Sequence, residues 1–305
     1  MKKLWVETYR PKSISDYVWK DDAQKKQVEQ WVHDQTIPHL LMSGSPGTGK
    51  TTMAKILMRE LDIDPADIMD ISQKDRGVDA MRNKIMNFAG TIPFGTTKII
   101  FIDEADNISL EGQQVMRTVM ETYSDNCRFI LTCNYPNKII PAIHSRCQGF
   151  HIEKLDLGLF TERVATILLT EIVEFDLDVL DTYVLGTYPD LRKCINNLQK
   201  ASVNGVLMPV SEQSVGTADY RLKMVNLYKE GKFQEARKLA CENVKPDEME
   251  DMFRWMYNSL HLWGDTPEQQ DKAIIIIRNG LVNHTLVGNP EINLAAVLCE
   301  LTMEK

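Results

Sequence analysis

Short apolar runs alternate with helix-like segments along the first half of the chain. In the segments between the runs, apolar residues recur at the spacing of an amphipathic helix. This alternation is typical of a parallel sheet whose strands are connected by helices. The pattern therefore predicts an α/β fold with strands at residues 39–42, 68–71, 98–102, 129–132 and 150–152.

The strand pattern ends at about residue 155, and the rest of the chain has a helical pattern. Residues 162–173 and 191–201 carry apolar positions at helical spacing. Residues 203–215 contain the glycine, proline and serines that are typical of a linker. We therefore predict an α/β domain, a small helical domain and a second helical domain over residues 1–154, 155–208 and 209–305.

A glycine-rich turn follows the first apolar run and precedes a helical pattern over residues 52–60. It matches the P-loop, in which backbone N–H groups and a helix N-terminus bind phosphate. Lys50 would reach the β- and γ-phosphates, and Thr51 would ligate Mg²⁺. A chance glycine-rich turn is the alternative, but the strand and helix on either side argue against it. The sequence thus predicts ATP and Mg²⁺ as cofactors, contacted by Gly44, Ser45, Pro46, Gly47, Thr48, Gly49, Lys50, Thr51 and Thr52.

Acidic side chains follow the buried run at residues 98–102. Ligands bind at the carboxyl ends of the strands in open α/β sheets, which is where Asp103 is expected. We predict that Asp103 holds Mg²⁺ and that Glu104 orients or polarises the attacking water. A solvated acidic turn is the alternative. Asp106 is equally well explained as a helix cap.

Three further polar residues are candidates for sensing the γ-phosphate. Asn134 follows an apolar run and is either a sensor of the γ-phosphate and water or a turn residue. Arg146 is either a surface charge or, in a ring ATPase, a finger that faces the neighbouring subunit's γ-phosphate. Arg192 begins a helix in the second domain, from which it would couple the domain angle to ATP occupancy.

Five further segments are distinctive, at residues 5–11, 72–79, 82–85, 145–147 and 190–192. They resemble the small-subunit type of replication factor C, a family of AAA+ ATPases that load sliding clamps. The resemblance is strong over residues 1–200, and residues 289–294 look most like the large subunit of T-even-type phage clamp loaders. It implies an α/β P-loop AAA+ domain, a helical lid domain and an all-helical collar domain.

The resemblance also implies partners and a working cycle. Family members form a spiral of five subunits held by their collars, open a ring-shaped clamp with ATP bound, and grip primer–template DNA. Hydrolysis then releases the closed clamp on DNA. Tyr9, Arg10 and Pro11 match the segment beside the adenine, together with Val18. The family's usual Asn-Ala-Ser-Asp is here residues 70–73, Asp-Ile-Ser-Gln, which leaves open whether Ser72 restrains Glu104 without DNA.

Two helices in the family line the spiral and follow the template backbone. The basic residues that match them are Lys74, Arg76, Arg82, Lys84 and Arg117, and a solvated helix face is the alternative for each. After the first of these helices, Thr91, Ile92 and Phe94 lie in a short loop. Apolar side chains exposed there would suit docking on the clamp, and core packing of Phe94 is the equal alternative.

Composition sets the limits of this interpretation. The formal net charge of −8 argues against a protein that coats nucleic acid nonspecifically. The six cysteines are scattered, without zinc-knuckle spacing, and no run approaches the roughly 20 apolar residues of a membrane span. The first residues lack the apolar stretch of a secretory signal. We therefore expect a cytoplasmic protein, in the host cytoplasm if phage-encoded, with no membrane partner.

Two rival functions remain at this point. One is another AAA+ replication or repair ATPase, such as a helicase loader or a branch-migration motor, which would need an added DNA-binding domain or other extensions. The other is a structural clamp-loader subunit that binds nucleotide without turnover. The intact Lys50, Asp103 and Glu104 argue against the second rival.

Overall fold

A computed structural model describes residues 3–71, 78–210, 220–284 and 286–303. Its contacts divide the chain into two compact units: Glu7–Asp156 form one, and Met1–Val6 with Leu157–Lys305 form the other. The finer division of the second unit into a lid and a collar stays a prediction.

The first unit contains a parallel sheet of five strands in the order β2-β3-β4-β1-β5. The inner strand β3, which lies between β2 and β4, is buried at every position, because helices cover both faces of the sheet. Each predicted strand is present, with ends that differ by up to two residues. The strands are β1 (Leu40–Ser43), β2 (Ile68–Asp70), β3 (Lys98–Ile102), β4 (Cys127–Cys133) and β5 (Gln148–His151).

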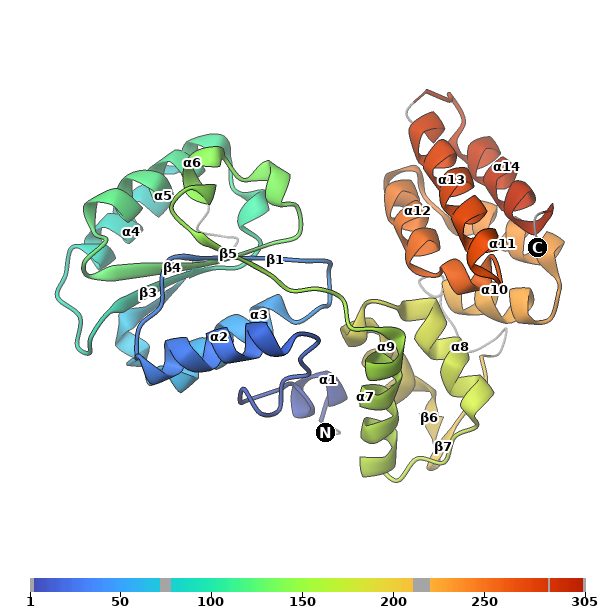
Figure 1. Cartoon of the computed structure of the whole chain (residues 1–305), viewed down its shortest axis with the longest axis horizontal. Helices are drawn as coiled ribbons and strands as arrows, with labels where there is room; N and C mark the ends of the chain where they lie inside the picture. Colours follow the sequence, from blue (N-terminus) through green and yellow to red (C-terminus); the bar gives the residue numbers. More distant parts are fainter. Residues whose placement is uncertain (1–2, 72–77, 211–219, 285, 304–305) are drawn as a thin grey trace. The chain divides into compact units, whose positions relative to one another are not determined.

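Helices cover the two faces of the sheet in separate layers (Figure 1). Side chains of β3 alternate between them, since Ile100 packs in the apolar cluster on one side and Phe101 in the cluster on the other. On the Phe101 side lie α2 (Asp22–His33) and α3 (Lys50–Glu60); on the Ile100 side lie α4 (Val78–Ala89), α5 (Leu110–Thr122) and α6 (Pro141–His144). Short helical turns complete this unit: α1 (Trp5–Thr8), which begins in the other unit, η1 (Pro65–Asp67), η3 (Ala105–Asn107) and η4 (Pro136–Lys138).

Two helix starts in this unit differ in a way that matters for the site. The Ser109 side chain caps α5 by accepting the N–H of Gly112 at 3.2 Å. The helix α3 instead follows Gly49, which adopts φ 99° and offers no side-chain cap. The first N–H groups of α3 are therefore left for an acceptor other than a capping side chain.

The second unit is mostly helical. Its largest apolar cluster lies among the C-terminal helices and includes Phe253, Trp255 and Trp263. The N-terminal residues join this unit, because the Trp5 N–H donates to Gln199 Oε1 at 3.0 Å. The elements are α7 (Leu157–Thr170), α8 (Leu177–Thr187), α9 (Leu191–Ala201), β6 (Ser202–Val203), β7 (Val206–Leu207), α10 (Tyr220–Lys229), α11 (Phe233–Asn243), η6 (Pro246–Glu248), α12 (Met249–Asn258), η7 (Leu260–Leu262), α13 (Pro267–His284) and α14 (Pro290–Met303).

Two predictions for this unit are wrong in detail. The start of the predicted linker is a small hairpin, β6 paired with β7, because Asn204 and Gly205 both take positive φ and make a two-residue turn. The helix predicted to reach residue 173 ends at Thr170, and Ile172 beyond it adopts φ 55°. Among the described residues, no helix combines the length and apolar character needed to cross a membrane.

Candidate active site

The glycine-rich loop between β1 and α3 is tightly packed against the backbone of a neighbouring segment. Gly44 adopts φ 153°, and a Cβ placed on it would lie 2.3 Å from the carbonyl oxygen of Ile152. Only glycine fits at such a distance, because the obstacle is a main-chain atom rather than the end of a mobile side chain. The close approach of the Ile152 backbone therefore requires glycine at the first position of the loop.

Lys50 lies at the start of α3 with its side chain inside the loop. The ammonium nitrogen donates to the carbonyl oxygens of Gly44 at 2.8 Å and Ser45 at 2.7 Å. The Thr48 hydroxyl donates to Ser45 O at 2.9 Å. Together with the uncapped N–H groups of α3, this gives a compact positive site that is suited to phosphate oxygens.

Asp103, at the end of β3, accepts hydrogen bonds from two hydroxyl groups on the same carboxylate oxygen. The Thr51 hydroxyl lies 2.8 Å from Oδ1, and the Thr132 hydroxyl lies 2.5 Å from it. Thr51 and Asp103 were predicted from the sequence to lie together, whereas Thr132 was missed. Its signal was a polar residue that directly follows the apolar run Phe129–Leu131 near the end of β4.

Thr51 and Asp103 fit a magnesium site that bound phosphates would complete. Mg²⁺ prefers oxygen ligands and is usually held by one or two protein groups together with substrate phosphates and water. Among the described residues there is no group of three His, Cys, Asp or Glu side chains that would form an all-protein metal cage. The chemistry of the donors thus agrees with the predicted Mg²⁺, with Thr51 and Asp103 as its protein ligands.

Glu104 adopts a left-handed backbone conformation, with φ 53° and ψ 53°. Such a conformation costs a non-glycine residue about 1–2 kcal/mol, so surrounding contacts must hold it. The Glu104 N–H donates to Thr132 Oγ1 at 2.9 Å, and the Asn107 side-chain amide donates to Glu104 Oε2 at 3.2 Å. Ser72, the other proposed restraint on Glu104, lies outside the described residues.

Asp106 supports the segment that carries Asn134. Its buried Oδ2 accepts the backbone N–H groups of Asn134 at 3.1 Å and Tyr135 at 3.0 Å. The helix-cap interpretation of Asp106 is therefore wrong. Cys133, the last residue of β4, precedes Asn134, and burial raises the pKa of its thiol to about 11, so the thiol stays protonated at neutral pH.

Tyr17 is the aromatic residue that contacts the phosphate loop. Its hydroxyl lies 3.4 Å from the Thr48 carbonyl oxygen, and its ring leaves little space for a Cβ on Gly49. Burial raises the pKa of Tyr17, which therefore remains neutral. The sequence interpretation assigned the adenine to the adjacent Val18 and to Tyr9, Arg10 and Pro11. These four are partly buried, and Arg10 pairs with Glu7 at 2.9 Å.

The two predicted arginine sensors lie in different units. Arg146 follows α6, and its NH1 donates to the carbonyl oxygen of Ala142 at 2.7 Å; its NH2 pairs with Glu121. Arg192 lies exposed in the first turn of α9, whose N-cap is Asp190. The finger role of Arg146 and the nucleotide contact of Arg192 stay predictions.

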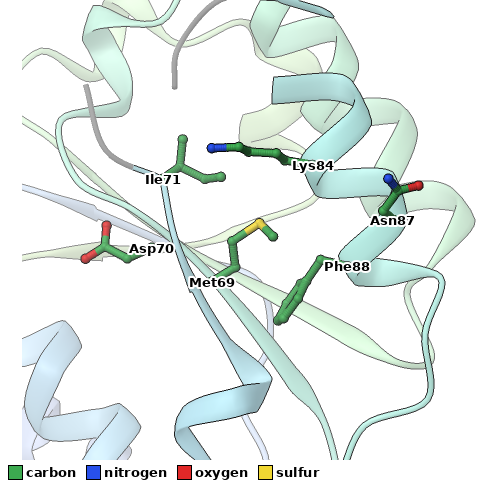
Figure 2. A pocket seen from close by; sticks show the side chains of 6 residues that line it. All are labelled: Met69, Asp70, Ile71, Lys84, Asn87 and Phe88. Atoms are coloured by element: carbon green, nitrogen blue, oxygen red, sulfur yellow. The ribbon is translucent and has the colours of Figure 1, made fainter. Parts of the chain in front are cut away.

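The predicted DNA-binding residues that the structure describes are exposed. Arg82 and Lys84 lie on α4, and Arg117 lies on α5, which packs beside it. Lys84 extends toward Ile71 across a pocket of about 570 Å³ that Phe88 also lines (Figure 2). Lys74 and Arg76 lie outside the described residues.

The loop after α4 presents two large apolar side chains to solvent. Ile92 is 86% exposed and Phe94 is 81% exposed, and Thr91 is also exposed. The alternative that Phe94 packs in the core is therefore wrong. The exposed pair meets the requirement for a docking surface, while contact with a clamp stays a prediction.

Two buried charged residues hold this loop from inside. The Lys98 ammonium donates to the Phe88 carbonyl oxygen at 3.0 Å and also to the Thr91 hydroxyl. Asp67 accepts the N–H of Gly95 at 2.8 Å. Both side chains are almost fully buried, so the loop is anchored on both sides of the exposed pair.

Comparisons with known proteins show which family the chain belongs to. The family described as "ATPase family associated with various cellular activities (AAA)" matches residues 40–154. The chain is 39% identical to the replication factor C small subunit of Methanococcus maripaludis over 248 residues, which is 78% of both chains. It is 40% identical to that of Sulfurisphaera tokodaii over 247 residues, covering 78% of this chain and 75% of the relative.

Solved structures give the fold alone. The Thermotoga maritima RuvB Holliday junction branch migration motor matches 73% of this chain and 80% of its own, with a TM-score of 0.55 and 16% sequence identity. The AAA+ fold class predicted from the sequence is confirmed by this likeness and by the family match.

Proposed function

Since the chain belongs to the replication factor C small-subunit family of AAA ATPases, we propose that it is a motor subunit of a DNA sliding-clamp loader. The chain is an ATP hydrolase of the AAA type. ATP binding opens the clamp and lets the complex grip primer–template DNA, and hydrolysis releases the closed clamp.

The observation that carries the proposal is the alignment of two acidic residues with the phosphate loop. The Thr51 hydroxyl, in the first turn of α3, lies 2.8 Å from Oδ1 of Asp103, and Glu104 directly follows Asp103 in the chain. Lys50, Thr51 and Asp103 would bind the phosphates and Mg²⁺, which neutralises charge on the transferring phosphoryl group. Glu104 would orient the attacking water, and Asn134 and Arg192 would sense the γ-phosphate.

Activation between subunits depends on Arg146. The residue lies near the surface with its side chain 31% exposed, as a group that acts on a neighbouring subunit must. A guanidinium beside the transferring phosphoryl group stabilises the negative charge of the transition state and is worth roughly 10³–10⁵ in rate. We propose partners of three kinds: other loader subunits, including further copies of this chain, a sliding clamp, and primer–template DNA.

The two rival functions have less support. The chain shares its fold with a branch-migration motor at 16% sequence identity, and a shared fold alone does not show a shared activity. A subunit without turnover has no need of a carboxylate beside the metal-binding pair, yet Glu104 is present and held in a strained conformation. Both features favour an active ATPase.

The test is ATP turnover by the assembled complex with primed DNA and candidate clamps. Lys50→Ala should abolish nucleotide binding, and Glu104→Gln should bind ATP without hydrolysing it. Arg146→Ala should bind ATP normally but stop hydrolysis in the adjacent subunit. Normal turnover by the Arg146 variant, or wild-type turnover that responds to neither DNA nor clamp, would contradict the proposal.

A further inference from the structure

Glu121, in the last turn of α5, holds two arginines with one carboxylate oxygen. Oε1 accepts from Arg117 Nε at 3.1 Å and pairs with NH2 of Arg146. The hydrogen bond from Arg117, together with the charges of both arginines, lowers the pKa of Glu121. The carboxylate is therefore charged at neutral pH and is shared between the two cations.

The guanidinium of Arg146 is anchored on one side. Its NH1 donates to Ala142 O at 2.7 Å and to the Ser145 hydroxyl at 3.2 Å, and its NH2 donates to Glu121. A guanidinium has five N–H donors, and these contacts use three of them. Within the described part of the chain, the remaining two have no acceptor, so the anchored group can still donate to a phosphate.

The shared oxygen joins two residues that are predicted to meet different partners. Arg117 lies one turn before Glu121 on α5 and is predicted from the sequence to contact DNA, whereas Arg146 follows α6 and is proposed to act on the neighbouring ATP site. The helices α5 and α6 pack together in the same unit. The connection between the two arginines therefore needs no intermediate residue other than Glu121.

We propose that Glu121 is a positioning residue for Arg146, and that DNA regulates it through Arg117. A DNA phosphate that draws Arg117 away leaves Oε1 to Arg146 alone, which fixes the finger more firmly for the neighbouring ATP. This inference rests on the proposed function. By linkage, binding of the finger to the neighbouring nucleotide strengthens DNA binding by the same factor.

All three side chains are partly exposed, which limits the size of the effect. Arg117 is 49% exposed, Glu121 42% and Arg146 31%. Ion pairs in such positions are screened by water and salt, so the expected change is about two- to fivefold.

The experiment compares Glu121→Gln with Glu111→Gln in the assembled complex. Both substitutions remove one exposed carboxylate from α5, but Glu111 makes no ion pair with any described residue. Glu121→Gln should lower kcat for ATP about two- to fivefold, leave KM unchanged and reduce the stimulation by primed DNA. Glu111→Gln should behave as wild type, and Glu121→Asp, which keeps the charge, should recover part of the loss.

Two outcomes would overturn the inference. One is a higher kcat for Glu121→Gln, because it would mean that Glu121 withholds the finger. The other is an unchanged stimulation by DNA in a variant whose melting temperature matches wild type. Arg146→Ala is measured in parallel. If ATP turnover by Arg146→Ala is unchanged, the proposed function fails. If Arg146→Ala lowers turnover but Glu121→Gln does not, only the present inference is overturned.

Discussion

The hydroxyl of Thr132 lies 2.5 Å from Oδ1 of Asp103 and donates its hydrogen to that oxygen. The same hydroxyl accepts the backbone N–H of Glu104 at 2.9 Å. Thr132 is 1% exposed, so water does not compete for these bonds. One side chain near the end of β4 therefore sets the positions of both acidic residues at the end of β3.

Replacing Thr132 by valine removes both hydrogen bonds while keeping the side-chain shape. The unpaired Glu104 N–H should cost about 1–3 kcal/mol of unfolding free energy. Because the Glu104 carboxylate would no longer be held in position beside the attacking water, kcat should fall about 10–100-fold. Urea unfolding and steady-state ATPase assays measure the two effects. Thr118→Val, on the exposed face of α5, is the matched control and should change neither.

A methyl group on Gly44 should close the phosphate loop to ATP. The Cβ of Gly44→Ala would meet the Ile152 carbonyl oxygen at 2.3 Å, which forces the backbone to move. We expect a loss of about 2–4 kcal/mol in stability and no detectable ATP binding by calorimetry. Gly149→Ala in β5 has open space around its Cβ and should bind ATP as wild type does. Equal behaviour of the two variants would contradict the steric argument.

Asp106 should matter for turnover without touching substrate. Asp106→Ala leaves the N–H groups of Asn134 and Tyr135 without their acceptor, at a cost of about 2–4 kcal/mol for the two. Asp106→Asn keeps a carbonyl oxygen at the same place and should retain most of the stability. The melting temperature and the ATPase rate should therefore both be highest for wild type, lower for Asp106→Asn and lowest for Asp106→Ala. An alanine variant as stable as wild type would show that the loop is held by other contacts.

The stability of the first unit should depend on pH through His39. Burial and the charge of Arg128 lower its pKa from 6.5 to about 4, and its Nδ1 accepts the Phe129 N–H at 3.0 Å. A lowered pKa means that the unfolded chain binds the proton more tightly. The contribution to stability is thus complete above pH 6.5 and is lost as pH falls toward 4.

His39→Asn retains an acceptor for the Phe129 N–H but does not titrate. Between about pH 7.5 and about pH 5.5, wild type should lose about 1 kcal/mol more unfolding free energy than the variant. Urea denaturation at the two pH values measures this difference. Parallel losses in both proteins would exclude His39 as the titrating group.

The sequence predicted the parts of the site that lie within short continuous segments. The phosphate loop is one run of residues, and Asp103 follows a strand whose apolar pattern is unmistakable, so both could be placed in the fold. The five strands were found for the same reason. Solvent exposure of Ile92 and Phe94, in contrast, was left open, because a sequence pattern does not show whether the loop after α4 folds back.

Apart from the pairing of Thr51 with Asp103, contacts between distant segments were not predicted. Thr132 meets Asp103, Tyr17 meets Thr48, and Glu121 meets Arg146 only because the sheet and helix packing bring them together. The hairpin at Asn204 and Gly205 is different. Its turn signal is present in the sequence, but the glycine and proline content of the surrounding segment was interpreted as a linker.

Truncating Phe94 should weaken clamp binding without weakening the fold. Phe94 is 81% exposed, so Phe94→Ala should change the unfolding free energy by less than about 0.5 kcal/mol. If the residue docks on a clamp, affinity should fall about tenfold or more, as measured by surface plasmon resonance with the assembled complex. Leu110→Ala, at another exposed apolar position of the same unit, serves as the control. Equal affinities for both variants would remove Phe94 from the docking surface.

The buried anchors Lys98 and Asp67 have a thermodynamic consequence for this loop. Because they fix the backbone on both sides of Ile92 and Phe94 when the domain folds, the entropy of ordering is lost at that stage and not on association. A partner that binds the loop therefore contacts a surface that already has its bound conformation. Encounter by diffusion, rather than rearrangement, then limits how fast the complex forms.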